Sequence, residues 1–350
     1  MGRASRDARP SGFCVGSVQI RNRVLLAPLS GITDVPFRRL ARRFGAGLVF
    51  SEMVASGELL RRSIESRRRA MADGEGVHAV QLAGREPRAM GEAARLLAGE
   101  GADLIDINFG CPAKKVVGGL SGSALMREPD LALRIIEATV AGAGDVPVSV
   151  KMRLGWDAAS INAPFLARGA QEAGARMVTV HGRTREQFYE GEADWNAVAR
   201  VREVIDIPLV INGDIAEFAS VCLARSASGA DAVMIGRGAC GRPWLPGLAA
   251  GEISVDVLAG IDAGEFVAAH YDSMLSHYGE VAGLRHARKH LGWYLDRAAS
   301  RMRSDATSAR AALMRTADPA VVTASLLSLL GGLSLADLET AGAPAQKQAA

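Results

Sequence analysis

The fold of this 350-residue chain is decided around residues 102–112, which read ADLIDINFGCP. The largely apolar run Ala102–Ile107 predicts a buried β-strand, and Gly110 and Pro112 mark its end. Glycine permits backbone angles that other residues avoid, and proline fixes the φ angle next to the cysteine. The sequence therefore predicts that the thiol of Cys111 is held in a fixed direction at the exit of a strand.

Cys111 has two interpretations. A lone cysteine in an intracellular protein is typically a small hydrophobic core residue. At the mouth of a buried strand, between glycine and proline, we favour a chemical role instead. Lys114 and Lys115 follow in the same loop, and nearby cations favour ionisation of a thiol.

Eight short apolar runs recur along the chain, with segments of helical length between them, for example 37–44, 87–98, 131–141, 165–173 and 198–204. The runs are Val24–Leu29, Leu48–Met53, His78–Leu82, Leu104–Asn108, Val148–Arg153, Met177–His181, Leu209–Asn212 and Ala232–Ile235. Apolar strands alternating with helices predict a parallel sheet covered by helices. Eight such units over roughly 225 residues match a (β/α)8 TIM barrel. A doubly wound sheet is the alternative, but it needs a glycine-rich phosphate turn where residues 27–31 read APLSG.

Polar residues follow the predicted strands, and the carboxyl ends of barrel strands carry the catalytic groups. They are Gln81, Asn108, Cys111, Lys151, Arg153, His181, Asn212, Asp214 and Arg237. The turns after strands seven and eight contain glycines, Gly213 and Gly236, and barrels often hold a phosphate there. Lys151 fits either a Schiff-base nucleophile or, with His181, a cation that neutralises an anion on a cofactor ring.

The composition is ordinary for a globular enzyme, with 49% hydrophobic and 23% charged residues. The four cysteines are scattered without a C-x-x-C pair, which argues against a disulfide framework and against a zinc site. The Arg-rich first residues contain no secretory apolar region, and no apolar run approaches the length of a membrane span. We expect a cytoplasmic monomer that uses no metal and no membrane.

The pattern becomes purely helical after about Val257, with helices predicted over 266–278, 286–299, 306–314 and 319–330. We therefore predict an N-terminal extension over 1–20, a catalytic barrel over 21–252, a small all-α helical bundle over 253–335, and a disordered tail over 336–350.

Positive charge is concentrated in this helical part. The stretch Arg285–Arg315 holds eight basic and two acidic residues, a net charge of +6 against +3 for the whole chain, which leaves −3 for the remainder. A charge run is commonly a solvated face. Its position beside Trp293 and Tyr294 favours a polyanion-binding surface, with nucleic acid as the expected partner.

In their order along the chain, these motifs resemble one family, the tRNA-dihydrouridine synthases, and most closely its bacterial B-type branch. The matching motifs are APLSGITD (27–34), PFR (36–38), SEM (51–53), QL (81–82), NFGCP (108–112), KMR (151–153), HGRT (181–184) and NGD (212–214). The segment RHARKH (285–290), with Trp293 and Tyr294, resembles that family's helical domain. The resemblance covers about Val24 to Leu295.

The resemblance implies a function and a set of roles. The reaction would be the flavin-dependent reduction of specific tRNA uridines to 5,6-dihydrouridine, with FMN re-reduced by NADPH or NADH. The FMN phosphate would lie on Asn212, Gly213, Asp214, Gly236 and Arg237, and its ring against Ala27, Pro28 and Leu29, with Gln81 at the polar edge and Lys151 and His181 near N1 and O2. Asn108 and Arg153 would read the uracil beside Tyr189, and Arg285, Arg288 and Lys289 would bind the tRNA.

The chemistry of uracil assigns Cys111 a role. The C5=C6 bond is conjugated to the C4 carbonyl, so C6 accepts a hydride from flavin N5 and C5 then needs a proton. A positioned acid supplies that proton faster than water does, and Cys111 is the candidate. Such an acid must be a thiol, whereas Lys114 and Lys115 favour a thiolate. The conflict is resolved if those lysines face RNA phosphates. Reaching the base also requires a splayed-out nucleotide, which tRNA loops provide.

Three other functions remain open from the sequence. An FMN barrel that oxidises or reduces a free pyrimidine, of the dihydroorotate or dihydropyrimidine dehydrogenase type, would share the phosphate site but would not need the basic helices. A Schiff-base aldolase would use Lys151 and leave Cys111 idle. A non-catalytic RNA-binding barrel protein would be colourless, so the colour of the purified protein separates it from every flavin enzyme.

Overall fold

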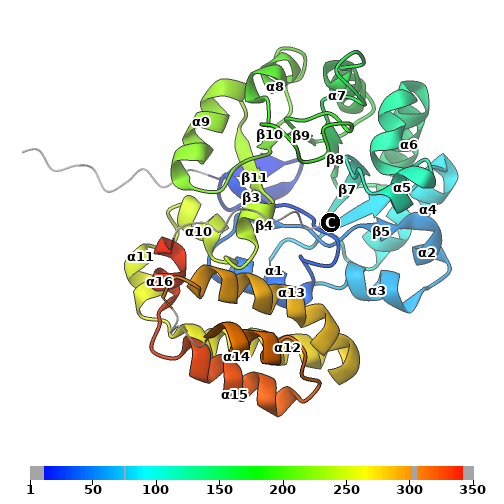
Figure 1. Cartoon of the computed structure of the whole chain (residues 1–350). Helices are drawn as coiled ribbons and strands as arrows, with labels where there is room; N and C mark the ends of the chain where they lie inside the picture. Colours follow the sequence, from blue (N-terminus) through cyan, green and yellow to red (C-terminus); the bar gives the residue numbers. More distant parts are fainter. Residues whose placement is uncertain (1–11, 75, 302–305, 342–350) are drawn as a thin grey trace, which may run out of the picture.

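The computed structural model describes residues 12–74, 76–301 and 306–341. Its main body is a curled parallel sheet with helices on its outer face (Figure 1). Within the described residues the sheet has nine strands, in the order β4-β3-β11-β10-β9-β8-β7-β6-β5. They are β3 (Val24–Leu26), β4 (Leu48–Val49), β5 (Val54–Ala55), β6 (Ala79–Ala83), β7 (Leu104–Phe109), β8 (Val148–Arg153), β9 (Met177–His181), β10 (Leu209–Asn212) and β11 (Ala232–Ile235).

The two ends of the sheet are β4, which begins the predicted strand 48–53, and β5, which lies just after it. The run 48–53 is interrupted after Val49, and the chain resumes pairing at Val54, so that β4 pairs with β3 and β5 with β6. Between them Phe50 forms a parallel bridge with Ala79, and the Ser51 amide donates to the Ala79 carbonyl at 2.9 Å. This bridge closes the sheet, and the predicted TIM barrel is confirmed.

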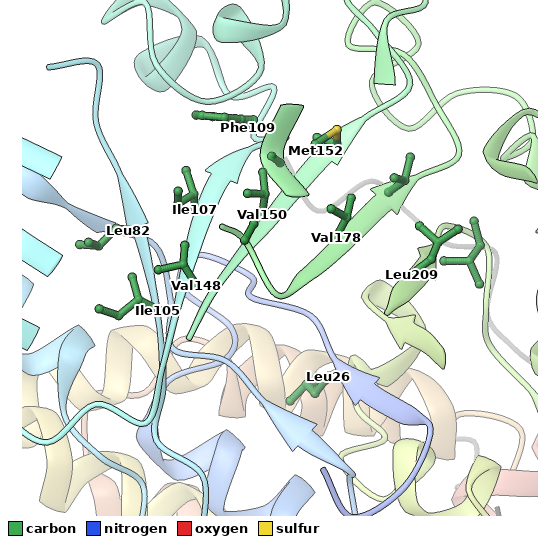
Figure 2. Packing of buried hydrophobic residues seen from close by; sticks show 14 of the residues in the cluster. Leu26, Leu82, Ile105, Ile107, Phe109, Val148, Val150, Met152, Val178 and Leu209 are labelled. Carbon is green, nitrogen blue, oxygen red and sulfur yellow. The ribbon is translucent and has the colours of Figure 1, made fainter. Parts of the chain in front are cut away.

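Alternation along the strands separates the outer core from the inner, functional face. In β7 and β8 the residues Ile105, Ile107, Val148, Val150 and Met152 belong to the core cluster packed under the helices (Figure 2). Successive strand residues point to opposite faces, so the residues between them point into the barrel. Those inward positions carry Asp106 and Asn108 on β7, and Ser149, Lys151 and Arg153 on β8.

Helices form the outer layer of the barrel. They are α1 (Val35–Arg43), α4 (Pro87–Gly99), α6 (Pro129–Ala143), α7 (Ala163–Glu172), α8 (Trp195–Arg202) and α9 (Phe218–Ser228). Short helices follow several strands on the side of their carboxyl ends: α2 (Ser56–Leu60) and α3 (Ile64–Ala70) after β5, α5 (Lys114–Gly118) and η1 (Gly122–Arg127) after β7, and η2 (Arg237–Ala239), α10 (Leu245–Ala249) and α11 (Val255–Ala259) after β11.

A β-hairpin seals the opposite end of the barrel. Strands β1 (Phe13–Val15) and β2 (Val18–Ile20) pair antiparallel, and Val15 and Ile20 are fully buried against residues that begin the barrel strands. Residues 12–20 are thus part of the barrel, which corrects the predicted extension over 1–20. Residues 1–11 lie outside the described part.

The helical domain contains α12 (Ala263–Tyr278), α13 (Glu280–Ala298), α14 (Ala306–Leu313), α15 (Pro319–Leu330) and α16 (Leu335–Thr340) around its own apolar core. Helix α16 corrects the predicted start of a disordered tail at residue 336, because Leu338 is fully buried and Glu339 accepts hydrogen bonds from Arg242 and Trp244 at 2.8 Å each. The remaining tail, 342–350, lies outside the described residues. No helix in the described ranges is long and apolar enough to cross a membrane.

Candidate active site

The Cys111 loop is fixed from both sides. The Asn108 side-chain oxygen accepts from the backbone N–H groups of Gly110 and Cys111, at 3.1 and 2.9 Å. The Cys111 carbonyl accepts from the amide and the hydroxyl of Ser123, at 3.1 and 2.9 Å. The strand that carries Asn108 therefore sets the position of the half-buried thiol.

The environment of this thiol keeps it protonated. Burial raises the pKa of Cys111 above the ordinary value of 9.0, and this effect outweighs a hydrogen bond from the Ala113 amide and the charges of Arg153 and Lys151, which lower it. The side chains of Lys114 and Lys115 lie outside the described residues. A thiol that holds its proton at neutral pH can act as a proton donor but is a poor nucleophile.

A buried carboxylate organises the loop from behind. Asp106 accepts from Gln81 Nε2 at 2.7 Å and from the Ser149 hydroxyl at 2.6 Å, and Gln81 Oε1 in turn accepts from Asn108 Nδ2 at 2.7 Å. Hydrogen bonds therefore run from Ser149 through Asp106, Gln81 and Asn108 to the Cys111 amide. Burial raises the pKa of Asp106 to about 6. The sequence analysis missed Asp106, and an acidic residue within an apolar strand was the available signal.

This chain of hydrogen bonds passes through the side-chain amide of Gln81, which is buried. The Gln81 side chain, which is predicted to contact the flavin, already donates to Asp106 and accepts from Asn108. The role of Gln81 toward a cofactor stays a prediction, and the observed contacts give it a positioning role.

Arg153 joins two loops of the barrel mouth. Its Nε donates to the Gly110 carbonyl at 2.9 Å, and its Nη1 donates to the carbonyls of Thr184 and Phe188 at 2.8 Å each. The residue is 1% exposed, and its guanidinium lies 5.5 Å from the ring centroid of Tyr189. These bonds show that Arg153 braces the Cys111 loop. Its expected contact with uracil stays a prediction.

Lys151 is a cation held inside the mouth. Its ammonium donates to Asn212 Oδ1 at 3.1 Å, and Asn212 Nδ2 donates to the Met234 carbonyl at 2.7 Å, so that strands β8, β10 and β11 are linked. Burial, together with the charge of Arg153, lowers the pKa of Lys151 to about 8. Burial, with Arg153 and Lys151 nearby, also lowers the pKa of His181 well below 6.5, so this imidazole is neutral at physiological pH.

Asp214 does not present a free edge to a phosphate. Its carboxylate forms a bidentate pair with Arg183 Nη2, at 2.8 and 2.6 Å, and accepts from the Ala193 amide at 2.7 Å. These bonds give the Asp214 carboxylate a positioning role, and the phosphate contact of the turn that contains it stays a prediction. Gly213, with φ of 118°, brings the turn close to His181, where a Cβ atom would lie 3.3 Å from the imidazole.

The turn after β11 remains suited to a ligand. A Cβ atom on Gly236 would meet only Ala27 Cβ and Asn212 Nδ2, both at 3.9 Å, so the backbone there faces ordinary contact space. The Ala27 amide donates to the Ile235 carbonyl at 2.8 Å, which places the predicted ring-lining segment 27–29 beside this turn. The Arg237 guanidinium lies 4.3 Å from the ring centroid of Tyr189, so strands β9 and β11 both contribute to this edge.

The basic residues of the helical domain do not form one face. Arg297 is buried and donates to the carbonyls of Leu338 and Glu339, and Arg310 pairs with Asp296. Of the predicted tRNA contacts, Arg285 is exposed and Arg288 and Lys289 are half-buried, and their contact with tRNA stays a prediction.

In the part of the chain that the structure describes, Lys151 leaves hydrogen-bond donors free at the barrel mouth. Lys151 has three donors but only one hydrogen bond among the described residues, and no described carboxylate lies within 4.0 Å of it. A buried ammonium in this condition suits a ligand that carries negative charge. In the ranges the structure describes, no cluster of three or more His, Cys, Asp or Glu side chains could hold a metal ion.

Comparisons with known proteins show the family of this chain. The family pattern described as "Dihydrouridine synthase (Dus)" matches residues 25–325. A "Probable tRNA-dihydrouridine synthase" of Rhizobium leguminosarum bv. phaseoli is 56% identical over 93% of this chain and all of the relative. The "tRNA-dihydrouridine synthase B" of Vibrio vulnificus is 40% identical over 80% of this chain and 88% of the relative.

Among solved structures, an old yellow enzyme homologue from Zymomonas mobilis superposes with a TM-score of 0.51 at 16% identity, covering 70% of this chain and 93% of that one. This likeness supports the barrel fold. The family pattern and the relatives go further, and the resemblance found in the sequence is confirmed: the chain belongs to the dihydrouridine synthase family.

Proposed function

We propose that this protein reduces specific uridines of tRNA to 5,6-dihydrouridine, using bound FMN that NADPH or NADH re-reduces. The observation that carries the proposal is the Cys111 thiol, fixed in a braced loop at the same barrel mouth as Lys151. The family relatives, named tRNA-dihydrouridine synthases, support it.

The flavin supplies a hydride to uracil C6 when it is bound. Addition at C6 leaves an electron pair at C5, and Cys111 Sγ–H donates its proton there, which completes the saturated C5–C6 bond. The resulting thiolate then takes a proton from solvent. Because burial raises the thiol pKa, the proton is present on Cys111 when the base arrives.

The remaining groups would orient the cofactor and the base, and would stabilise the negative charge that develops. Lys151 and neutral His181 would face the edge of the ring that becomes anionic on reduction, where a cation and a hydrogen-bond donor stabilise charge. Gly236 and Arg237 would hold the phosphate, with segment 27–29 and Gln81 against the ring. Asn108 and Tyr189 would flank the uracil, while Arg153 keeps the thiol loop in register with the β9 loop.

The test uses purified protein and a tRNA transcript that carries no modifications. We expect a yellow protein that releases FMN on denaturation and, with NADPH, produces dihydrouridine in the transcript, detected by mass spectrometry of its nucleosides. Orotate and uracil serve as alternative substrates in parallel reactions. A colourless protein, or a flavoprotein that reduces only a free pyrimidine, would contradict the proposal.

A further inference from the structure

A second basic segment lies in the barrel itself, between β5 and β6. Residues 56–71, which form α2 and α3, contain five arginines and two glutamates. Arg61, Arg62 and Arg67 are exposed. Arg61 pairs with Glu58 at 2.7 Å, but both side chains are at least half exposed, so the pair is weak. In the described part of the chain, neither Arg62 nor Arg67 has a carboxylate partner.

The backbone at the α2–α3 junction presents these side chains to solvent. Arg62 has φ of 58°, a left-handed conformation that glycine adopts readily and arginine rarely does. Its amide donates to the Leu59 carbonyl at 2.9 Å and closes α2. A glycine would suit this conformation, so the turn itself does not require a long cation at this position.

The arginine segment touches the helical domain. The Arg68 guanidinium lies 5.4 Å from the ring centroid of Tyr278 at the end of α12. That ring stacks on His286 of α13, with centroids 4.3 Å apart and planes at 13°. Figure 1 shows α3 beside the start of α13. The arginine segment of the barrel therefore meets the helical domain at the junction of α12 and α13.

Helix α13 continues the charge toward the barrel mouth. Arg285 is exposed at its start, and one turn further the Lys289 Nζ atom lies 2.7 Å from where a Cβ atom on Gly31 would be, above the loop that follows β3. These charges affect two neighbouring histidines. Burial is the main cause that lowers the pKa of His286, and the charges of Lys289 and Arg285 lower it further. Burial, together with the charge of Arg68, lowers the pKa of His277 to about 4.

We propose that Arg61, Arg62 and Arg67 of the barrel, with Arg285 and Lys289 of α13, form one surface that binds the phosphate backbone of the tRNA beside the target nucleotide. This inference rests on the proposed function. A surface with an excess of positive charge that crosses two domains suits a long polyanion, because each neutralised phosphate releases condensed counterions. Three of these five residues belong to the catalytic barrel.

The experiment measures affinity for unmodified tRNA across a salt series, using the flavin-loaded enzyme. The test variant combines Arg61→Ala, Arg62→Gly and Arg67→Ala. The control variant combines Arg95→Ala, Arg168→Ala and Arg200→Ala, three exposed arginines on α4, α7 and α8 that remove the same charge. Flavin content and reduction by NADPH report whether each variant is folded, and Arg67→Gln alone provides a milder second test.

We expect the test variant to bind tRNA about tenfold or more weakly near physiological salt, with a salt slope reduced by about 2, while the control stays near wild type. Arg67→Gln should reduce the slope by about 1. Test and control variants with the same affinity for tRNA would overturn the inference. That result is also the one expected if the surface binds an acidic protein and not tRNA. If wild type itself neither binds tRNA nor forms dihydrouridine, the proposed function fails and this inference falls with it.

Discussion

The Cys111 site and the boundary between the two domains differ in how completely their buried polar groups are hydrogen-bonded. At the site, Asp106, Gln81, Asn108 and Arg153 are buried and joined by hydrogen bonds of 2.7 to 2.9 Å. At the boundary, His290 is just as buried, but neither of its ring nitrogens has a partner among the described residues. The boundary also contains hydrogen bonds, from Tyr278 to Asp34 and from Arg242 to Glu339, but within the described ranges the ring of His290 is held there by packing alone. The difference indicates that the barrel mouth is built for fixed geometry, whereas part of the boundary depends on packing.

The largest expected effect is at the thiol. Cys111→Ala should reduce uridine reduction by about 10²–10⁴-fold while flavin binding is kept, because a general acid is lost while the backbone hydrogen bonds to Asn108 and Ser123 that hold the loop remain. Turnover on tRNA measures this, with Cys222→Ala, an exposed cysteine on α9, as the matched control. Full activity of Cys111→Ala would remove the thiol from the mechanism.

A smaller effect on turnover is expected at Asp106, the buried carboxylate behind the Cys111 loop. Asp106→Ala removes the acceptor of Gln81 and Ser149, which should lower the free energy of unfolding by about 1–3 kcal/mol and turnover by about 10–100-fold as the Cys111 loop loses its register. Asp106→Asn keeps an oxygen for Gln81 and can donate to Ser149, so it should recover most of the activity. Denaturant unfolding and turnover check both. Equal loss in the two variants would show that hydrogen-bond positioning is not the cause.

The pH dependence of uridine reduction sharpens the same contrast. A donor works only when protonated, so activity is lost as pH rises through its pKa in the folded protein. Because burial raises the pKa of Cys111 above 9.0, the reaction of pre-reduced enzyme with tRNA should stay level to about pH 9 and decline only above it. The pH dependence of flavin reduction by NADPH, measured without tRNA, reports the titration of Lys151, whose pKa is about 8. A decline of the tRNA reaction centred below 8.5 would contradict the assignment.

The smallest effect is expected at the boundary. His290 packs against Phe37 and His270, with ring centroids 5.4 and 5.1 Å away, so His290→Phe should change stability at pH 7 by less than about 1 kcal/mol. Burial holds the pKa of His290 well below 6.5, so the unfolded chain takes up more protons as pH falls and stability declines below about 6.5. The variant should weaken this acid sensitivity. Thermal unfolding at pH 7 and pH 5 measures it, and an unchanged pH dependence would assign the sensitivity to other groups.

The sequence predicted the barrel strands well because each is a short apolar run ended by a sharp change of residue type. The bounds of β8, β9, β10 and β11 agree residue for residue with the runs identified in the sequence. The second strand was less accurate, since its middle, Phe50–Met53, leaves the sheet register without becoming polar enough to show it. Helix α16 was missed because its burial depends on Arg242 and Trp244, which are far away in the sequence.

Site residues were predicted by type but not by partner. The strand ends identify Lys151, Asn212 and Cys111, whereas the pairing of Asp214 with Arg183 depends on two loops meeting in space. The basic surface was placed wholly in the helical domain, because net charge along the sequence does not show that Arg297 is buried or that Arg310 is paired. A charge count over residues 56–71 was the signal that could have identified the barrel arginines.

The central claim is that Cys111 supplies a proton to the base while a separate group supplies the hydride. The most direct measurement is a single turnover of Cys111→Ala in two halves. Flavin reduction by NADPH should proceed at the wild-type rate, because the thiol has no part in it. Reoxidation of the reduced flavin by tRNA, with dihydrouridine as product, should be about 10²–10⁴-fold slower. Reoxidation by tRNA at the wild-type rate, or an equal slowing of both halves, would contradict the account.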